Sequence, residues 1–344
     1  MTSTGDRHSP PASRRVLVTG GAGFIGSHLV RMLVDRGDAV TVVDDLSTGR
    51  RENLDSRARF VHADVRDALV GPLANETFDQ VYHLAAVVGV KLVVDDPLNA
   101  IEVNVGRTSD VLRFALTAGP NETPAKVLLT SSSEVYGKGT TNPFSEDDNV
   151  VYGPTTVSRW CYGCSKAIDE YLALAYHRQR GLPAVVVRLF NTVGPGQVGD
   201  YGMVLPRFVN AALEGRPIEV YGDGAQTRCF CDVRDVVQAF PALLDHPEAP
   251  GRVFNVGSDQ PISIRDLAMT VVRTLASASS VRLVPYADAY APGFEDLRDR
   301  RPDLGRIRSA IGWQSRVPLD RTIRDIAASL GAAQTPQGVA GGSR

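Results

Sequence analysis

The sequence has little of what marks an exported, membrane-bound or nucleic-acid-binding protein. Four cysteines in 344 residues are too few for a disulfide scaffold, and no apolar run reaches the roughly 18 residues of a membrane span. Lys and Arg number 37 against 39 Asp and Glu, so the net charge of −2 draws the chain neither to nucleic acid nor to a membrane. The first residues carry no apolar stretch of signal-peptide length. We therefore expect a cytoplasmic globular protein.

The cysteines lie in two close pairs, Cys161 with Cys164 and Cys229 with Cys231. Such pairs could bind zinc or form a redox couple. Reduced, partly buried thiols are the favoured interpretation, because Cys-X-Cys is poor ligand spacing and the first pair overlaps a catalytic motif described below. We expect no metal site.

A strand, a glycine-rich turn and a helix follow the N-terminal residues. RVLVT at 15–19 is a short, β-branched, apolar run, and TGGAGFIG follows at once. Apolar residues then recur at helical spacing until Gly37. A second apolar run, AVTVV at 39–43, ends at Asp44. This order predicts the first unit of a dinucleotide-binding sheet.

Each glycine of the turn has a physical task in such a unit. Gly20 allows a sharp turn off the strand, Gly23 lets a pyrophosphate approach the backbone, and Gly26 lets the helix pack close to the sheet. The free N–H groups at the helix N-terminus attract phosphate. Asp44 can accept hydrogen bonds from the adenosine ribose. Since its charge would repel a 2′-phosphate, the pattern favours NAD over NADP.

Strand-like runs recur at 59–63, 80–86, 126–132 and 184–190, with helical stretches at about 98–118 and 162–180. This alternation predicts an α/β fold with a doubly wound parallel (Rossmann) sheet, whose ligands bind at the carboxyl ends of the strands. Asp64 is either an adenine ligand or a strand-end cap. With the three glycines and Asp44, the candidate cofactor-binding residues are Phe24, Ile25, Asp45, Ser47, Thr48, Gly49, Asp64, Val65, Leu84, Ala85, Ala86 and Phe190.

Tyr162 and Lys166 stand at i and i+4, on one face of a predicted helix. A cation there lowers the pKa of the phenol, and a phenolate can take a proton from a substrate hydroxyl as hydride leaves the same carbon. The preceding polar strand end, at 130–137, adds Ser132 to bind that hydroxyl. It also adds Glu134, which is an acid–base group, a charge that shapes the site, or a satisfied loop carboxylate.

Together these motifs resemble the extended short-chain dehydrogenase/reductases. The GxxGxxG spacing of Gly20–Gly26, Asp44, the serines before Glu134 and the Tyr162/Lys166 pair carry the resemblance, which covers about residues 15–328. These enzymes are nucleotide-sugar epimerases, 4,6-dehydratases and decarboxylases. The resemblance implies tightly bound NAD, hydride that often returns, and a homodimer.

SEVYG at 133–137 resembles the UDP-glucuronate decarboxylases, and segments at 153–162, 226–235 and 293–303 are similar to the same enzymes. The resemblance implies C4 oxidation of UDP-glucuronic acid and loss of CO2, giving UDP-xylose, a UDP-4-keto-pentose, or both. A UDP-sugar 4-epimerase, an NDP-glucose 4,6-dehydratase and a non-catalytic NAD-binding module stay open. Ser132 stands where these decarboxylases usually have Thr, and Gly196 where Arg is common.

The resemblance also assigns residues. Arg300 corresponds to an arginine that acts on the sugar carboxylate or as a proton donor, and Arg228 to one that grips the diphosphate, which suits a guanidinium fork. Asn104 corresponds to an asparagine near the nicotinamide. The catalytic set is Ser132, Ser133, Glu134, Tyr162, Lys166 and Arg300, and the substrate set is Val88, Ser133, Glu134, Asn191, Thr192, Arg207, Tyr221, Arg228 and Arg300.

Four parts of the chain follow from these assignments. Residues 1–14 and 331–344 are expected to be disordered tails. Residues 15–190, with about 225–258, are expected to form the NAD-binding domain. A smaller C-terminal nucleotide-sugar-binding domain is expected from about 195–224 and 259–330.

Overall fold

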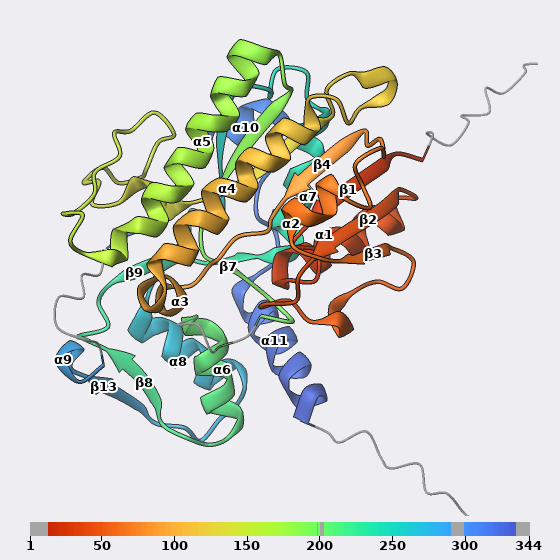
Figure 1. The fold of residues 1–344 in the computed structure, drawn as a ribbon. Coiled ribbons are helices and arrows are strands. Elements are labelled where there is room, and N and C mark those ends of the chain that lie inside the picture. The colour runs from red at the N-terminus through yellow and green to blue at the C-terminus, as the bar shows by residue number, and fades with distance from the viewer. Residues whose placement is uncertain (1–12, 198, 200–202, 290–298, 335–344) are drawn as a thin grey trace, which may run out of the picture.

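The computed structural model describes residues 13–197, 199, 203–289 and 299–334 (Figure 1). A seven-stranded sheet with strand order β11-β6-β5-β4-β1-β2-β3 forms its centre, and every neighbouring pair is parallel. The order reverses between β1 and β4, which is where doubly wound sheets bind ligands. The predicted fold class is therefore confirmed. The strands are β1 (Arg15–Thr19), β2 (Ala39–Asp44), β3 (Arg59–His62), β4 (Gln80–His83), β5 (Lys126–Ser132), β6 (Ala184–Leu189) and β11 (Val253–Val256).

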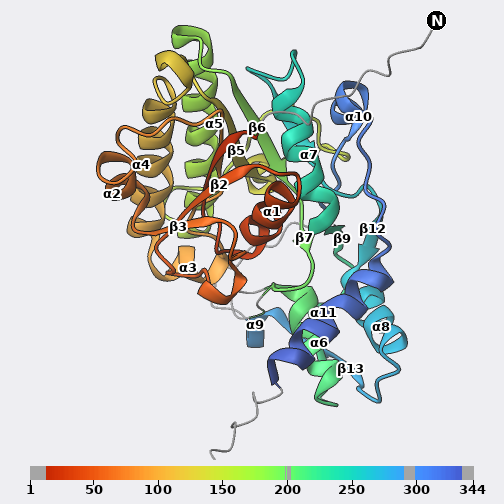
Figure 2. The same cartoon turned by 90° about the vertical axis from the view of Figure 1, so that its right-hand side faces the viewer.

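Helices cover both faces of this sheet (Figure 2). Successive strand residues point to opposite faces, so Val16 and Val18 pack with α1 and α7, whereas Leu17 packs with α2, α4 and α5. Both faces are apolar, which explains why these strands read as continuous apolar runs. The helices are α1 (Phe24–Asp35) and α7 (Val233–Asp245) on one face, and α2 (Val65–Val70), α4 (Pro97–Ala115) and α5 (Cys161–Arg180) on the other.

A smaller unit with its own apolar core lies beyond the carboxyl ends of the strands (Figure 1). Its helices are α6 (Val204–Leu213), α8 (Ile264–Thr274) and α11 (Leu319–Gln334). Strand β8 (Ile218–Tyr221) pairs with β13 (Val281–Val284), β9 (Thr227–Cys229) with β12 (Pro261–Ser263), and β7 (Thr192–Val193) with β10 (Cys231–Asp232). The other elements are α3 (Val90–Asp95), α9 (Tyr286–Ala289), α10 (Gly305–Ile311), and the 3-10 turns η1 (Arg51–Asn53), η2 (Pro120–Glu122), η3 (Ser133–Tyr136) and η4 (Ser158–Trp160).

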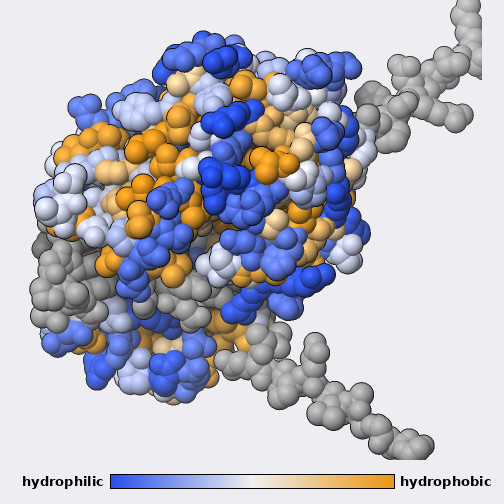
Figure 3. Space-filling view, in the orientation of Figure 1, coloured by the Kyte–Doolittle hydropathy of each residue, from blue (hydrophilic) through white to orange (hydrophobic). Residues whose placement is uncertain are grey.

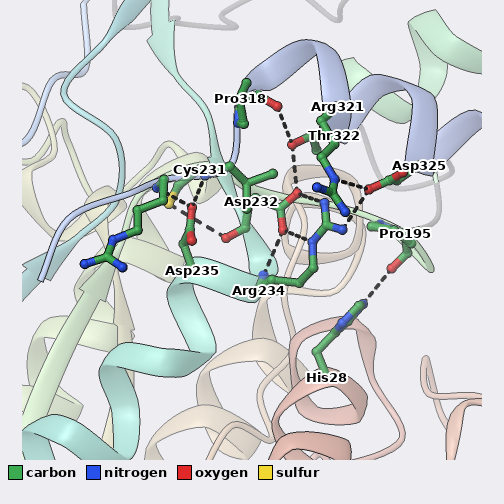
Figure 4. Close-up of polar contacts among 12 residues, drawn as sticks. His28, Pro195, Cys231, Asp232, Arg234, Asp235, Pro318, Arg321, Thr322 and Asp325 are labelled. Atoms are coloured by element: carbon green, nitrogen blue, oxygen red, sulfur yellow. Dashed lines mark hydrogen bonds and ion pairs between the residues drawn. The ribbon is translucent and has the colours of Figure 1, made fainter.

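A polar cluster joins the smaller unit to the sheet (Figure 4). Asp232 caps α7 by accepting from the backbone N–H of Arg234 at 2.9 Å, and it accepts from the hydroxyl of Thr322 on α11 at 2.7 Å. Arg234 also forms an ion pair with Asp325 of α11, with 2.7 Å between Nη1 and Oδ2. These bonds attach α11 to α7, and so fix the smaller unit next to the carboxyl ends of the strands.

The chain returns from the smaller unit to the sheet before α11. Leu304, Ile307 and Trp313 are buried in the core shared by α1 and α7, although they fall within the segment expected to form the smaller domain. The indole N–H of Trp313 donates to the carbonyl of Asp235 at 2.9 Å. The domain boundaries stay a prediction. No helix among the described residues is long and apolar enough to cross a membrane.

Candidate active site

The glycine turn between β1 and α1 has the geometry that the sequence predicts. Gly20 has a φ of +73°, and a Cβ there would lie 2.6 Å from the amide nitrogen of Ala85. A Cβ on Gly26 would lie 2.1 Å from the carbonyl oxygen of Gly20. Gly23 is the N-cap of α1 and has no side chain to cap it, so the first N–H groups of the helix stay open to an anion.

Asp44 is the last residue of β2 and lies next to this turn. Its carboxylate accepts from the backbone N–H groups of Ala22 and Leu46, both at 2.9 Å, and burial raises its pKa. A Cβ on Gly49 would lie 2.7 Å from Oδ1, so the following loop also packs against the carboxylate. Since each carboxylate oxygen has two lone pairs, one position on each oxygen remains for a ribose hydroxyl.

Asp64 is a helix cap. It accepts from the backbone N–H of Arg66 at 2.8 Å at the start of α2, and its other oxygen accepts from Nε of Arg107 at 2.8 Å. The cap interpretation of Asp64 is confirmed, and adenine binding stays a prediction. In the preceding loop, Asp45 accepts from the backbone N–H of Ser47 at 2.9 Å, beside Thr48.

Tyr162 lies in the first turn of α5, near Ser132 at the end of β5. Burial raises the pKa of Tyr162 well above its usual value, and the neighbouring Ser132 side chain only partly opposes this. Lys166 does not reverse the shift, because its Nζ donates to Asp169 at 3.0 Å, and both side chains are buried. The predicted lowering of the phenol pKa is therefore wrong for the protein by itself.

A buried polar chain continues behind Lys166. The hydroxyl of Thr108 on α4 lies 3.2 Å from Nε2 of His83. His83 in turn lies 2.7 Å, through Nδ1, from the hydroxyl of Thr19 at the end of β1. Burial, and then the charge of Lys166, lowers the pKa of His83 to about 3, so the ring is neutral at physiological pH.

Glu134 is bound by two arginines. It lies on η3, directly after β5, and its backbone N–H donates to the hydroxyl of Ser132 at 3.2 Å. Oε2 accepts from Nη1 of Arg159 at 2.8 Å, and Oε1 accepts from Nη1 of Arg300. Burial alone would raise the pKa of Glu134, but the charges of Arg300 and Arg159 outweigh it and set the pKa at about 2. Glu134 therefore stays ionised near neutral pH. A fixed negative charge that shapes the site is a better role for it than proton transfer as an acid–base group.

Arg159 is a site residue that the sequence analysis missed. It lies on η4, which directly precedes the helix of Tyr162, and only 9% of its side chain is exposed. Its guanidinium also lies 5.5 Å from the ring of Trp160. The available signals were a charged residue three positions before Tyr162 and its place in the segment 153–162, since its partner Glu134 is distant in the sequence.

Arg300 reaches Glu134 because its segment is bound to the loop around Phe144. The backbone N–H of Phe144 donates to the carbonyl of Arg301 at 2.8 Å, and that of Asp303 donates to the carbonyl of Phe144 at 2.8 Å. The side chain of Arg300 is 7% exposed. The preceding motif at 293–298 lies outside the described residues.

The remaining predicted residues have other described contacts, and Asn104 also donates to the hydroxyl of Ser165, which donates to the carbonyl of Tyr162. Asn104 accepts from the backbone N–H of Val87 at 2.8 Å. This bond fixes the segment that contains the predicted residues Leu84, Ala85, Ala86 and Val88. Asn191, which follows Phe190, donates to the carbonyl of Cys229 at 3.3 Å and precedes Thr192 of β7. Arg207 stacks over the ring of Tyr221 at 4.0 Å, and Arg228 donates to the carbonyl of Thr227 at 2.7 Å.

All four cysteines are free thiols. Burial raises the pKa of Cys229 to about 12 and also raises the pKa values of Cys161, Cys164 and Cys231. Within the described ranges, no group of three or more His, Cys, Asp or Glu side chains lies together as a metal site would need.

Comparison with known proteins shows which family the chain belongs to. The profile described as the NAD dependent epimerase/dehydratase family matches residues 16–257, which include the glycine turn, the Tyr162/Lys166 pair and, except for Arg15, all seven strands of the sheet. The chain belongs to this family. The match ends at 257, so it does not include Arg300.

Two curated relatives extend the similarity through Arg300. The UDP-N-acetyl-alpha-D-glucosaminuronate decarboxylase of Bacillus cytotoxicus is 40% identical over 317 residues, covering 91% of this chain and 96% of the relative. UDP-glucuronic acid decarboxylase 1 of Arabidopsis thaliana is 36% identical over 308 residues, covering 89% of this chain and 67% of the relative. Both names denote decarboxylases of a nucleotide-linked uronic acid.

Solved structures share the whole architecture. A UDP-N-acetylglucosamine 4-epimerase from Methanobrevibacter ruminantium, in complex with UDP-N-acetylmuramic acid, has a TM-score of 0.83 and 29% identity, covering 94% of this chain and 99% of its own. The dTDP-glucose 4,6-dehydratase DesIV from Streptomyces venezuelae, with NAD and TYD bound, has a TM-score of 0.79 and 31% identity, covering 92% and 98%. The fold is therefore common to several reactions, so the reaction must be argued from the site.

Proposed function

We propose that this chain is an NAD-dependent decarboxylase of a UDP-linked hexuronic acid, with UDP-glucuronic acid as substrate. The observation that carries the proposal is the buried guanidinium of Arg300, which is bound to Glu134 in the turn that begins at Ser132 and still has a free Nε–H among the described contacts. Guanidiniums bind carboxylates, so a sugar carboxylate and the hydroxyl to be oxidised would both have partners in one site. The names of the two curated relatives support the same reaction.

The residues between β1 and β2 fit NAD. The cradle at Gly23 has no side chain to obstruct a pyrophosphate, the N-terminus of α1 faces it, and Asp44 lies at the next strand end for the ribose. A neighbouring structure with NAD bound supports this cofactor. Bound NAD would supply a hydride acceptor for C4 and a positive charge that lowers the pKa of a nearby phenol.

In this proposal Tyr162 takes the proton of the sugar 4-hydroxyl, while Ser132 binds the same hydroxyl. Lys166 stabilises the phenolate and binds the nicotinamide ribose. Once C4 is a ketone, the carboxylate belongs to a β-keto acid, and CO2 leaves as the electrons of its bond move into the ketone. Protonation at C5 then gives a UDP-4-keto-pentose, which becomes UDP-xylose if the hydride returns to C4.

The other predicted residues have roles in binding. Arg228 is proposed to bind the diphosphate through its guanidinium fork. The backbone around Leu84 and Ala85 is proposed to line the cofactor, with Asn104 fixing its shape. The further substrate contacts are proposed to come from Val88, Ser133, Asn191, Thr192, Arg207 and Tyr221.

We also propose a cytoplasmic homodimer. Large apolar side chains are exposed on the outer face of α4 and α5, where Figure 3 shows orange surface. Leu98 and Tyr171 are each 66% exposed, and Ile101 and Ile168 are 41% and 44% exposed. Pairing of this face with a second copy would remove the apolar area from water. Light scattering should give twice the chain mass for the wild type and a lower mass for Leu98→Glu/Tyr171→Glu.

A second substrate is UDP-N-acetyl-α-D-glucosaminuronic acid, favoured by the 40% identity to a decarboxylase of that name over 91% of this chain. Release of labelled CO2 from each substrate, carrying carbon-13 at C6, tests the proposal and ranks the two. Release from either one supports a uronic acid decarboxylase. Absence of labelled CO2 from both, with NAD still bound, would overturn it.

A further inference from the structure

Carboxylates commonly bind arginine through two parallel hydrogen bonds, yet Glu134 does not bind Arg300 in this way. One oxygen, Oε1, accepts from Nη1 of Arg300. The other oxygen, Oε2, is bound 2.8 Å from Nη1 of Arg159 instead. Arg159 therefore turns Glu134 so that it occupies only one donor position of the Arg300 guanidinium.

This arrangement leaves part of Arg300 available. Its Nε is buried and has no hydrogen-bond acceptor among the residues that the structure describes. The side chain as a whole is only 7% exposed, so water does not easily satisfy that N–H. A buried donor without an acceptor is unfavourable, and such a group at a site is a position where a ligand can bind.

The cluster of Glu134, Arg159 and Arg300 is also placed for substrate. Glu134 donates its backbone N–H to the hydroxyl of Ser132, and Ser132 lies near enough to the phenol of Tyr162 to lower its pKa. The turn that begins at Ser132 therefore also carries the carboxylate that binds Arg300. In a hexuronic acid the carboxylate carbon is C6, which is bonded to C5. Since C5 is bonded to C4, the carboxylate lies close to the 4-hydroxyl.

We propose that Arg159 is a positioning residue that determines selectivity for a carboxylate: by binding one oxygen of Glu134, it keeps the Nε edge of Arg300 open for the substrate carboxylate. Arg159 acts through Glu134 and does not itself contact the sugar. The inference rests on the proposed function, because it requires a substrate with a carboxylate. It adds a residue and a way in which the site distinguishes uronic acids from neutral sugars.

The test is calorimetric binding of two ligands, UDP-glucuronic acid and UDP-glucose, to the full-length protein loaded with NADH, which cannot accept the C4 hydride and so prevents turnover. UDP-glucose lacks the carboxylate and serves as the internal reference. In Arg159→Gln, Glu134 is free to pair with Arg300 through both oxygens. We expect the affinity for UDP-glucuronic acid to fall roughly ten- to a hundredfold, the range of one charged hydrogen bond, while the affinity for UDP-glucose stays the same.

Two further variants separate positioning from a direct contact or a folding defect. Glu134→Gln/Arg159→Gln removes the competing carboxylate, so it should regain most of the lost affinity for UDP-glucuronic acid. Arg159→Lys keeps a cation for Glu134 and should lose less than Arg159→Gln. Bound NAD and the melting temperature of each variant report whether it folds.

Each outcome decides the inference. Recovery in the double variant supports it, whereas no recovery means that Arg159 contacts the carboxylate directly and overturns the positioning role. An equal loss of both ligands in Arg159→Gln would show a purely structural residue and also overturn it. If the wild type binds UDP-glucuronic acid no better than UDP-glucose, both the inference and the proposed substrate fail.

Discussion

Replacing Gly26 with alanine should destabilise the protein and weaken NAD binding together. The new Cβ would lie 2.1 Å from the carbonyl oxygen of Gly20 and 2.7 Å from Cα of Gly21, and both are backbone atoms that no side-chain rotation can move. The start of α1 must then shift away from β1 by roughly 1 Å to reach ordinary contact. Overpacking of this kind costs about 1–3 kcal/mol, which lowers the melting temperature by about 2–6 °C.

Gly23→Ala is the matched control in the same turn. Its Cβ would lie 3.3 Å from the same oxygen, and φ of −74° with ψ of 177° is a conformation that alanine adopts. This variant should melt closer to the wild type than Gly26→Ala does, since its Cβ requires a backbone shift of only a few tenths of an ångström. Its NAD affinity should still fall, because the methyl group projects where the pyrophosphate approaches. Scanning fluorimetry and NAD titration measure both quantities. A Gly26→Ala protein that melts and binds NAD like the wild type would refute this reasoning.

Three further changes test the site. Tyr162→Phe should lower turnover about 10²- to 10⁴-fold with unchanged NAD affinity, because it removes the proton acceptor. Near-normal turnover would show that Tyr162 does not accept the proton. The pKa of Glu134, about 2 in the folded protein, lies below its unfolded value, so its stabilisation is present above pH 4.5 and is lost as pH falls toward 2. Urea unfolding from pH 5 to 3 should therefore show a steeper loss of stability in the wild type than in Glu134→Gln, and equal slopes would contradict it. Asp169→Asn leaves the buried Lys166 without its carboxylate and should cost roughly 3–5 kcal/mol in the same assay, and an unchanged unfolding midpoint would argue against the buried pair.

The central sheet could be predicted closely from the sequence because its strands are buried on both faces. The runs at 15–19 and 126–132 are β1 and β5 with the same bounds, and the helices expected at about 98–118 and 162–180 are α4 and α5. The strand expected at 80–86 ends at His83, where the chain leaves the sheet to pass Gly20.

The short strands of the smaller unit could not be predicted in this way. Strands β8 and β13 have four residues each, and they pair although more than fifty positions of sequence lie between them. Their partly exposed residues lack a continuous apolar run. Only tertiary contact determines such pairing, so local pattern carries little information about it.

The motifs of the site could be predicted, but its electrostatics could not. Tyr162 and Lys166 are separated by one helical turn, which a sequence shows directly. Glu134 is separated from Arg159 by 25 positions and from Arg300 by 166, so their ion pairs exist only in the folded chain. The sign of the Tyr162 pKa shift was missed for the same reason, since burial and the neutralisation of Lys166 by Asp169 depend on packing.

The most direct test of the proposed function is a proton NMR time course of the purified protein with NAD and UDP-glucuronic acid. The account predicts that the hexuronic acid signals disappear and that those of a UDP-pentose, its 4-ketone, or both replace them in Tyr162-dependent fashion. Signals of UDP-galacturonic acid would contradict it and indicate a 4-epimerase, and an unchanged spectrum with NAD bound would contradict it as well.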